Sequence, residues 1–295
     1  MCLHNLYQRS NFILIIEVQL QHYKNMPCRG NYKRKIMANF APVRKEQHQN
    51  LKLASKRDLK HVEGQHIVAI TAAEYAQASA SFPVVLVKNP DSPRYRSVAM
   101  LGLEAGENLY YKDSKWSGLL LPQSVGMAPF ALGLDPDKEN TLTACVDMDS
   151  PLVGEDKDVA LFEADGKESE LLTNVQNSLG RLYENEKMTE NFIKELEEND
   201  LLQEIDLNID LASGEKKKVT GIFTINEDKV KALSDDKVLD FHKRGLFVPI
   251  YGMLGSLGQI NRLVQLRNLT GQAQISGIQI APVVKEAAKE EVAES

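Results

Sequence analysis

The chain has 295 residues, of which 43% are hydrophobic and 26% charged, so it can bury the core of one large domain or two small ones. A formal net charge of −6 gives no general positive field, which argues against nucleic acid as a partner. The longest apolar run, residues 12–16, is interrupted by Glu17 and is far shorter than the roughly 20 residues that cross a membrane. We therefore expect a soluble, cytoplasmic protein that does not span a membrane.

Cysteine and histidine are too scattered to indicate a disulfide framework or a zinc site. The residues concerned are Cys2, Cys28 and Cys145, with His61, His66 and His242 as the histidines beyond residue 50. Cys145 lies in an apolar run, where a free thiol behaves as a small hydrophobic side chain. We expect neither a metal nor a cofactor.

Residues 1–36 show neither a helical nor a strand period, and we expect them to be an upstream-translated or disordered extension. Met37 resembles an ordinary start, and the basic residues 33–35 before it could be a translated ribosome-binding stretch. The alternative is a genuine N-terminal extension. A signal peptide is not supported, because the polar run 19–24 follows the apolar patch where a small-residue cleavage site belongs.

The first half of the chain predicts short, mostly antiparallel strands. A strand at 66–71 leads to a helix capped by Thr71 and Glu74 that ends by Pro83. Further short strands, separated by turns such as 113–115, are expected at 84–87, 97–103, 108–111, 132–134, 141–147 and 159–162.

The second half predicts a helical hairpin, a β-hairpin and C-terminal helices. Apolar residues at helical spacing begin after Glu168, and Thr189 is expected to cap the second helix of the hairpin. Alternating residues 205–211 and the run 219–225 predict paired strands, followed by helices capped by Asn226 and Ser234. The whole is an α+β domain over 37–269, with a flexible tail at 270–295.

The last predicted helix, 246–266, carries glycine at every third position: Gly252, Gly255 and Gly258. We expect another element to pack closely against this face, since glycine permits short backbone distances. The segment 255–258 also resembles a hydrolase elbow, but Leu254 stands where that motif requires glycine. The sequence therefore favours packing over a nucleophilic Ser256.

Five acidic residues lie close together and raise the possibility of a calcium site: Asp135, Asp137, Glu139, Asp147 and Asp149. Counted from Asp135, the sixth position is Asn140 rather than glycine and the twelfth is Val146 rather than glutamate. An EF-hand loop is excluded, and solvated turn carboxylates are the simpler interpretation.

The sole tryptophan, Trp116, follows Tyr110 and Tyr111 in the sequence, and the three rings are candidates for one wall of a ligand pocket. Asn108 and Asp147 are candidate polar anchors for that ligand. The competing interpretation is an aromatic cluster in the core.

Several short segments, in this order and spacing, resemble the bacterial SapC-like family over residues 51–269. They are residues 71–74 with Phe82-Pro83, Asn108-Leu109-Tyr110 with Asp113 and Trp116, Pro129-Phe130 before Asp147, Leu161-Phe162 with Gly166, Thr189 with Phe192, residues 221–233, and residues 256–259 with Leu263. The resemblance implies a mixed α+β architecture and lends no catalytic residue. The family label is linked to surface-layer and peptide-transport systems, and relatives are often encoded near flavin-dependent halogenases and outer-membrane receptors.

Three functions follow as hypotheses. The first is a non-catalytic accessory protein that binds a small molecule, peptide or protein, because no catalytic constellation is evident. The second is an enzyme of unrecognised type in a halogenase-linked or peptide-modification pathway, since catalytic groups can converge from distant positions. The third, a surface-layer assembly or export component, rests on the family label alone. A strongly shifted pKa on a carboxylate or histidine inside the largest cleft would favour an enzyme, and a large exposed apolar patch would favour a partner-binding protein.

Overall fold

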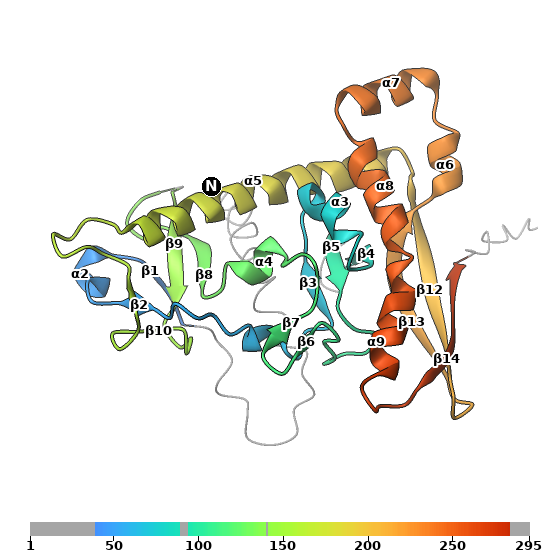
Figure 1. Ribbon diagram of the computed structural model, residues 1–295. Helices are drawn as coiled ribbons and strands as arrows, with labels where there is room; N and C mark the ends of the chain where they lie inside the picture. The colour runs from blue at the N-terminus through green and yellow to red at the C-terminus, as the bar shows by residue number, and fades with distance from the viewer. Residues whose placement is uncertain (1–38, 89–93, 140, 284–295) are drawn as a thin grey trace, which may run out of the picture.

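The computed structural model describes residues 39–88, 94–139 and 141–283 (Figure 1). The predicted N-terminal extension, residues 1–36, lies outside this range. Within it the chain is an α+β protein with a β-rich first half and helices concentrated in the second, as predicted. None of the helices in the described ranges is long and apolar enough to cross a membrane.

The largest sheet has six antiparallel strands in the order β14-β12-β13-β4-β5-β3. Their bounds are β3 (Ile67–Ala69), β4 (Val84–Lys88), β5 (Tyr95–Met100), β12 (Leu202–Leu211), β13 (Lys216–Ile225) and β14 (Ile275–Pro282). The predicted alternation holds in part of β12: Ile205, Leu207 and Ile209 are buried, but Asp206, at a register shift between β12 and β13, is buried as well. Gly214, with φ of +86°, lies in the turn that joins β12 to β13, a conformation that favours glycine.

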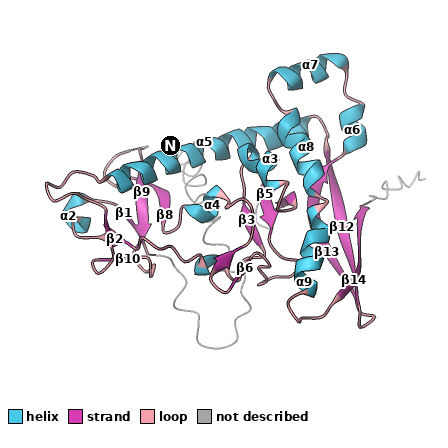
Figure 2. Cartoon of the chain, in the orientation of Figure 1, coloured by secondary structure: helices cyan, strands magenta, loops and turns pink. Residues whose placement is uncertain are grey.

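Two helices cover the long strands of this sheet (Figure 2): α8 (Phe247–Ser256) contacts β13 and β4, and α9 (Gln259–Asn268) contacts β14. The short helix α3 (Tyr75–Ala78) lies against α8. A Cβ atom on Gly252 would lie only 3.2 Å from Tyr75, so the predicted close approach is confirmed there. Gly255 and Gly258 are exposed and face no neighbouring element within the described residues.

A second, smaller core lies between two three-stranded sheets and the first half of α5 (Glu170–Glu198). The strands of these sheets are β1 (Phe40–Pro42), β9 (Leu142–Asp147) and β8 (Phe130–Leu134), then β10 (Val153–Gly154), β2 (Lys52–Leu53) and β11 (Val159–Ala160). The remaining elements are short: α2 (Lys45–His48), η1 (Lys60–Val62), η2 (Ala72–Glu74), β6 (Tyr111–Lys112), β7 (Lys115–Trp116), α4 (Gln123–Gly126), α6 (Glu227–Lys231) and α7 (Asp235–Lys243).

Helix α5 is shared by both cores. Its first half buries Leu172, Val175 and Leu179 in the smaller core. Its second half buries Phe192 and Leu196 in the larger core. In Figure 1 the helix runs along the molecule from β8 and β9 to α3 and α8.

The predicted helical hairpin is wrong, because α5 is one continuous helix of 29 residues. Thr189 does not cap a second helix. Its Oγ1 donates to the carbonyl of Asn185 at 2.7 Å and accepts a hydrogen bond from the backbone N–H of Ala72 at 2.8 Å. The side chain therefore joins α5 to η2.

Two further boundaries differ from the prediction. The last predicted helix is two helices, α8 and α9, separated at Leu257 and Gly258. The predicted flexible tail is wrong for residues 275–282, because β14 pairs with β12 along its length. Residues 284–295 lie outside the described ranges.

Candidate functional site

Three of the four predicted site residues lie close together: the rings of Tyr110 and Trp116 lie beside Phe82, and Asn108 bonds to the backbone of Tyr110. The Trp116 ring centroid is 6.1 Å from that of Tyr110 and 5.8 Å from that of Phe82. The Tyr110 hydroxyl donates to the carbonyl of Ser81, and Trp116 Nε1 donates to the carbonyl of Leu120 at 2.9 Å. Burial raises the pKa of Tyr110 to about 12.

The side-chain amide of Asn108 forms hydrogen bonds with the backbone around it. Its Nδ2 donates to the carbonyl of Val62 at 2.7 Å, and its Oδ1 accepts from the N–H groups of Tyr110 and Tyr111. The polar groups of the aromatic cluster are therefore bonded within the protein, an arrangement typical of a core. A ligand-binding role for these residues stays a prediction.

Asp147, the fourth predicted residue, lies on β9 in a different sheet, opposite Phe40. Burial raises the pKa of its carboxyl group, and its Oδ1 accepts a hydrogen bond from the N–H of Asp149 at 3.1 Å. The structure does not bring Asp147 into the cluster around Trp116.

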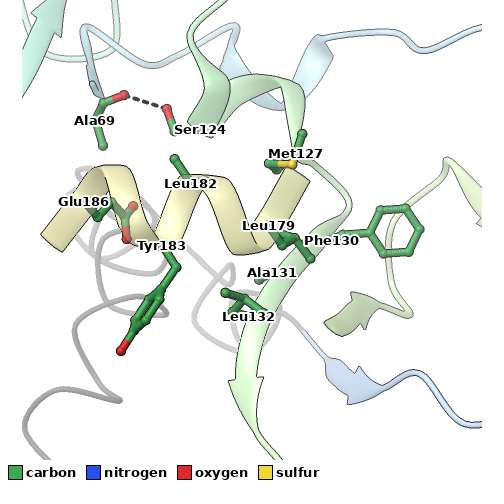
Figure 3. Close-up of a pocket in the computed structure, with 10 residues that line it drawn as sticks. All are labelled: Ala69, Ser124, Met127, Phe130, Ala131, Leu132, Leu179, Leu182, Tyr183 and Glu186. Carbon is green, nitrogen blue, oxygen red and sulfur yellow. Dashed lines mark hydrogen bonds between the residues drawn. The ribbon is translucent and has the colours of Figure 1, made fainter. Parts of the chain in front are cut away.

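A small pocket lies where α5 passes over β8, α4 and the end of β3 (Figure 3). Most of its lining is apolar, with three polar side chains. The lining residues are Ala69, Ser124, Met127, Phe130, Ala131, Leu132, Leu179, Leu182, Tyr183 and Glu186. Its volume is about 30 Å³, which suits a group the size of a water molecule or an amine.

Glu186 is the ionisable group of this pocket that stands out. Burial, reinforced by the nearby carboxylates of Glu190 and Glu74, raises its pKa to about 7. Among the described residues no hydrogen bond or ion pair satisfies its carboxyl group. The side chain is half-buried, so solvent offsets only part of the cost of leaving a carboxylate unpaired on an apolar wall.

The neighbouring polar groups are already used. Ser124 Oγ donates to the carbonyl of Ala69 at 2.6 Å. Glu74 forms the predicted capping box with Thr71, and its other oxygen accepts from the N–H of Gln123 at 2.8 Å. Within the described parts of the chain, the carboxyl group of Glu186 thus has no protein hydrogen-bond partner.

Sequence reasoning missed Glu186 although a signal exists. Leu179, Leu182, Glu186, Thr189 and Ile193 recur at the three- and four-residue spacing of one helix face. A glutamate on an otherwise apolar stripe indicates a carboxylate that is partly removed from solvent, and Glu186 is half-buried. Only the structure places it beside a cavity.

A second hollow, of about 540 Å³, lies near the end of α5 and includes Glu197, Asp200, Glu204 and Lys229 in its lining. Asp200 and Lys229 form an ion pair. This surface is mainly polar and open to solvent, so water competes there with any ligand.

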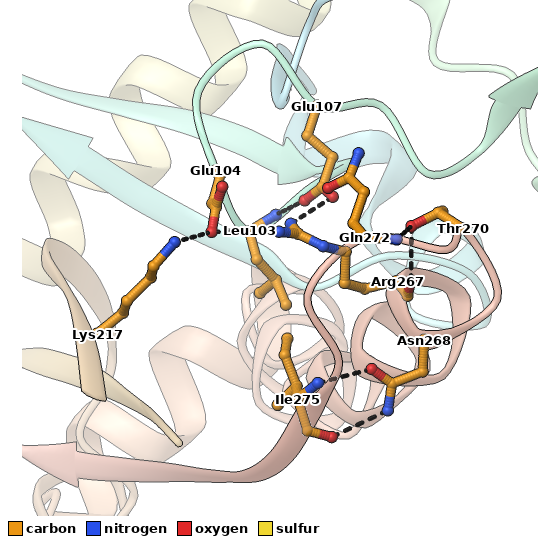
Figure 4. Close-up of polar contacts among 9 residues, drawn as sticks. All are labelled: Leu103, Glu104, Glu107, Lys217, Arg267, Asn268, Thr270, Gln272 and Ile275. Carbon is orange, nitrogen blue, oxygen red and sulfur yellow. Dashed lines mark hydrogen bonds and ion pairs between the residues drawn. The ribbon is translucent and has the colours of Figure 1, made fainter. Parts of the chain in front are cut away.

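A polar cluster around Arg267 is structural (Figure 4). Arg267 is 3% exposed, and its Nη1 lies 2.5 Å from Glu107 Oε1. Glu107 Oε2 accepts from the N–H of Leu103 at 2.9 Å. Glu104 bonds to Lys217 at 2.8 Å and lies 3.3 Å from Arg267, and these cations, Lys217 first, lower the pKa of its carboxyl group. The cluster ties α9 to the loop after β5 and to β13.

In the parts of the chain that the structure describes, no three His, Cys, Asp or Glu side chains form a group that could hold a metal ion. Asp135 and Asp137, from the acidic segment, both bind Arg44. Cys145 is buried and free, and burial raises the pKa of its thiol.

Comparison with known proteins gives a family. No curated protein and no solved structure matches the chain. The SapC family model matches residues 43–263, which is well over half of the chain. The match includes the smaller core, most of the larger core and all the residues that line the pocket beside Glu186, while Ile275 of the larger core lies beyond it. The chain belongs to the SapC family.

Proposed function

We propose that this protein is a non-catalytic binding protein of the cytoplasm that holds the amine end of a small molecule or peptide in the pocket beside Glu186. The observation that carries the proposal is a carboxyl group with a raised pKa, on an apolar wall, with no partner among the described residues. The proposal keeps the accessory role expected from the sequence and specifies one kind of ligand, an amine.

An ammonium group is the chemical complement of this pocket. A carboxylate held among apolar side chains gains from a cation that forms charge-assisted hydrogen bonds with it. Leu179, Leu182 and Leu132 offer apolar contact to the carbon next to the nitrogen. Because the volume is about 30 Å³, the pocket accepts the end of a ligand, with the rest outside.

The lining residues of the pocket favour a binding site over a catalytic site. No histidine or cysteine is among its lining residues. The hydroxyl of Ser124 donates to the carbonyl of Ala69 and not to a base, whereas a nucleophile requires a base to activate it.

One observation favours an enzyme as the second candidate. A carboxyl group with a pKa of about 7 suits general acid–base catalysis near neutral pH. In that case Glu186 would transfer a proton to or from a bound substrate in a halogenase-linked or peptide-modification pathway.

The test is calorimetric titration of the full chain with primary alkylamines of increasing length at pH 8, where Glu186 is ionised. We expect binding, with affinity falling at least about tenfold in Glu186→Gln, since a charged hydrogen bond is lost. Glu184→Gln, an exposed neighbour on α5, is the matched control and should bind as the wild type does. Carboxylic acids of equal length should not bind.

Two outcomes would contradict the proposal. Equal amine affinity in the wild type and Glu186→Gln would place the site elsewhere, and no binding by the wild type would remove it. Consumption of the amine, followed by NMR, would favour the enzyme instead.

A further inference from the structure

Strand β14 lies at one edge of the six-stranded sheet (Figure 1). It pairs with β12 on one side, and no strand in the described ranges pairs with its other side. Its residues, 275–282, include no charged side chain. Natural edge strands are usually protected from pairing with another chain by charges, bulges or a cover. A long edge without charge therefore indicates an interaction surface.

The outer edge of β14 presents backbone groups that no described strand uses. The N–H of Val283 donates to the carbonyl of Glu204 at 2.9 Å, and the hydrogen-bonded pairs of an antiparallel ladder recur at every second residue. The N–H and C=O groups of Ile278 and Ile280 therefore point away from β12. Pro282 takes the next outward position, where its missing N–H costs no bond to β12. The open segment is thus residues 276–280, and it ends before this proline.

The charges around this edge permit an identical strand to approach. A two-fold axis places like residues near each other, so a charged edge would be repelled by its own copy. Asp206 and Asp210 lie one strand away on β12, and each has a lysine of β13 as its ion-pair partner. Glu204 lies opposite the last described residue, beyond the open segment. Arg262, the exposed cation of α9, lies near Tyr110 instead. Among the described residues, no uncompensated charge beside the open segment opposes a second copy.

Two exposed apolar side chains lie at opposite ends of β14. Leu269, which follows α9 and precedes the strand, is 76% exposed, and Ile280 near the end of the strand is 38% exposed. Ile280 shares its face of the sheet with Ile278, which packs against the larger core on the side of α9. Antiparallel pairing of two copies places the start of one β14 beside the end of the other. Leu269 of one copy then lies at the same end as Ile280 of the second copy, which removes apolar surface from water at both ends.

We propose that this protein forms a dimer in which the β14 strands of two copies pair antiparallel and join their sheets. Ile278 faces Ile278 of the second copy, and Ser276 faces Ile280, so every outward N–H and C=O of the open segment has a partner. Pro282 stays outside this register because it has no N–H to donate. Residues 284–295 are a poorer occupant of the edge, because they are rich in alanine, glutamate and lysine, which form strands poorly. The dimer is independent of amine binding beside Glu186.

Sedimentation equilibrium of the full chain over a wide range of protein concentration tests the proposal, and we expect a reversible dimer. Ile280→Pro should raise the dissociation constant of the dimer at least about tenfold, because an outward hydrogen bond is lost in each copy. The pairing with β12 does not use this N–H, so the circular dichroism spectrum should match that of the wild type. Val248→Ser, at an exposed apolar site on α8, is the control and should dimerise as the wild type does. A wild type that is monomeric at all concentrations, or an Ile280→Pro variant that dimerises equally tightly, would overturn the proposal.

Oxidative cross-linking tests the register. Residue 278 faces its own copy, and the Cα atoms of a hydrogen-bonded pair are about 5.5 Å apart, a separation that a disulfide spans. Ile278→Cys should therefore form a covalent dimer above the background that the wild type shows through its own cysteines. Ile280→Cys faces Ser276 of the second copy and should stay at that background. Equal cross-linking of the two variants would contradict the proposed pairing, and so would an Ile278→Cys variant that does not cross-link.

Discussion

Two carboxylate regions of this molecule, one buried and one half-buried, differ in the groups that face the charge. Glu107 lies against Arg267 and a backbone N–H, whereas Glu186 lies among leucines with two other carboxylates nearby and no partner in the described residues. Loss of solvent penalises a carboxylate charge, and Glu107 is buried whereas Glu186 is half-buried. The comparison shows that the groups facing a carboxylate determine its role. A carboxylate with a cation beside it stabilises the fold, and one without a partner can bind a ligand.

The largest expected effect comes from removing Arg267, the cation that faces Glu107. Arg267→Met should lower the free energy of unfolding by about 3–5 kcal/mol, because it leaves Glu107 buried without its cation. Urea unfolding measures the change. Arg262→Met, on the exposed side of α9, is the control and should change stability by less than about 0.5 kcal/mol.

The double variant Arg267→Met/Glu107→Gln sharpens this result. Removing both charges should recover part of the loss, because the stranded carboxylate is gone. If the double variant instead loses as much stability as Arg267→Met and Glu107→Gln lose together when measured singly, the ion pair is not the main source of the loss.

The second region should show the opposite response, with a defined pH dependence. Its folded pKa of about 7 lies above the ordinary value of 4.5, so the folded state holds the proton more tightly than the unfolded state does. Glu186 therefore lowers stability increasingly as pH rises from about 4.5 through 7.

Glu186→Gln removes this penalty. We expect a gain of about 1–2 kcal/mol at pH 8, discounted because the side chain is partly exposed, and no gain near pH 4.5. Thermal unfolding of the wild type, Glu186→Gln and Glu184→Gln at both pH values is the measurement. A gain that does not depend on pH would mean that the carboxylate is not the cause.

The smallest effect is expected at the exposed end of the first region. Lys217 bonds to Glu104, and both side chains are more than a third exposed. Lys217→Ala should cost no more than about 0.5 kcal/mol, because solvent screens the pair, and added salt should reduce the difference further. Urea unfolding in low and high salt checks this, and a cost as large as that of Arg267→Met would refute the distinction between buried and exposed parts of the cluster.

Much of the fold could be predicted because local patterns and tertiary structure agree. The alternation of 205–211 became β12, and Asn226 caps α6 by accepting from the N–H of Lys229. Asp113 and Ser114 adopt positive φ in the predicted turn. In these places the side chain needs only its neighbours in sequence to reach its structure.

The predictions were wrong where a contact with a residue distant in sequence determines the local structure. Thr189 has the chemistry of a helix cap, but the N–H of Ala72, 117 residues away in sequence, uses its hydroxyl. Strand β14 depends on pairing with β12, a partner that its own composition does not indicate. For the same reason the sequence places Glu186 on an apolar stripe but cannot show that no cation faces it.

One feature of the architecture governs how the molecule should respond to heat and to ligands. Because α5 supplies side chains to both cores, melting of either one removes packing from the other, which favours a single cooperative transition. Glu186 and the leucines beside it occupy the middle of that helix. A ligand bound there would stabilise the helix that both cores share, and so protect backbone amides at both ends of α5 from hydrogen exchange.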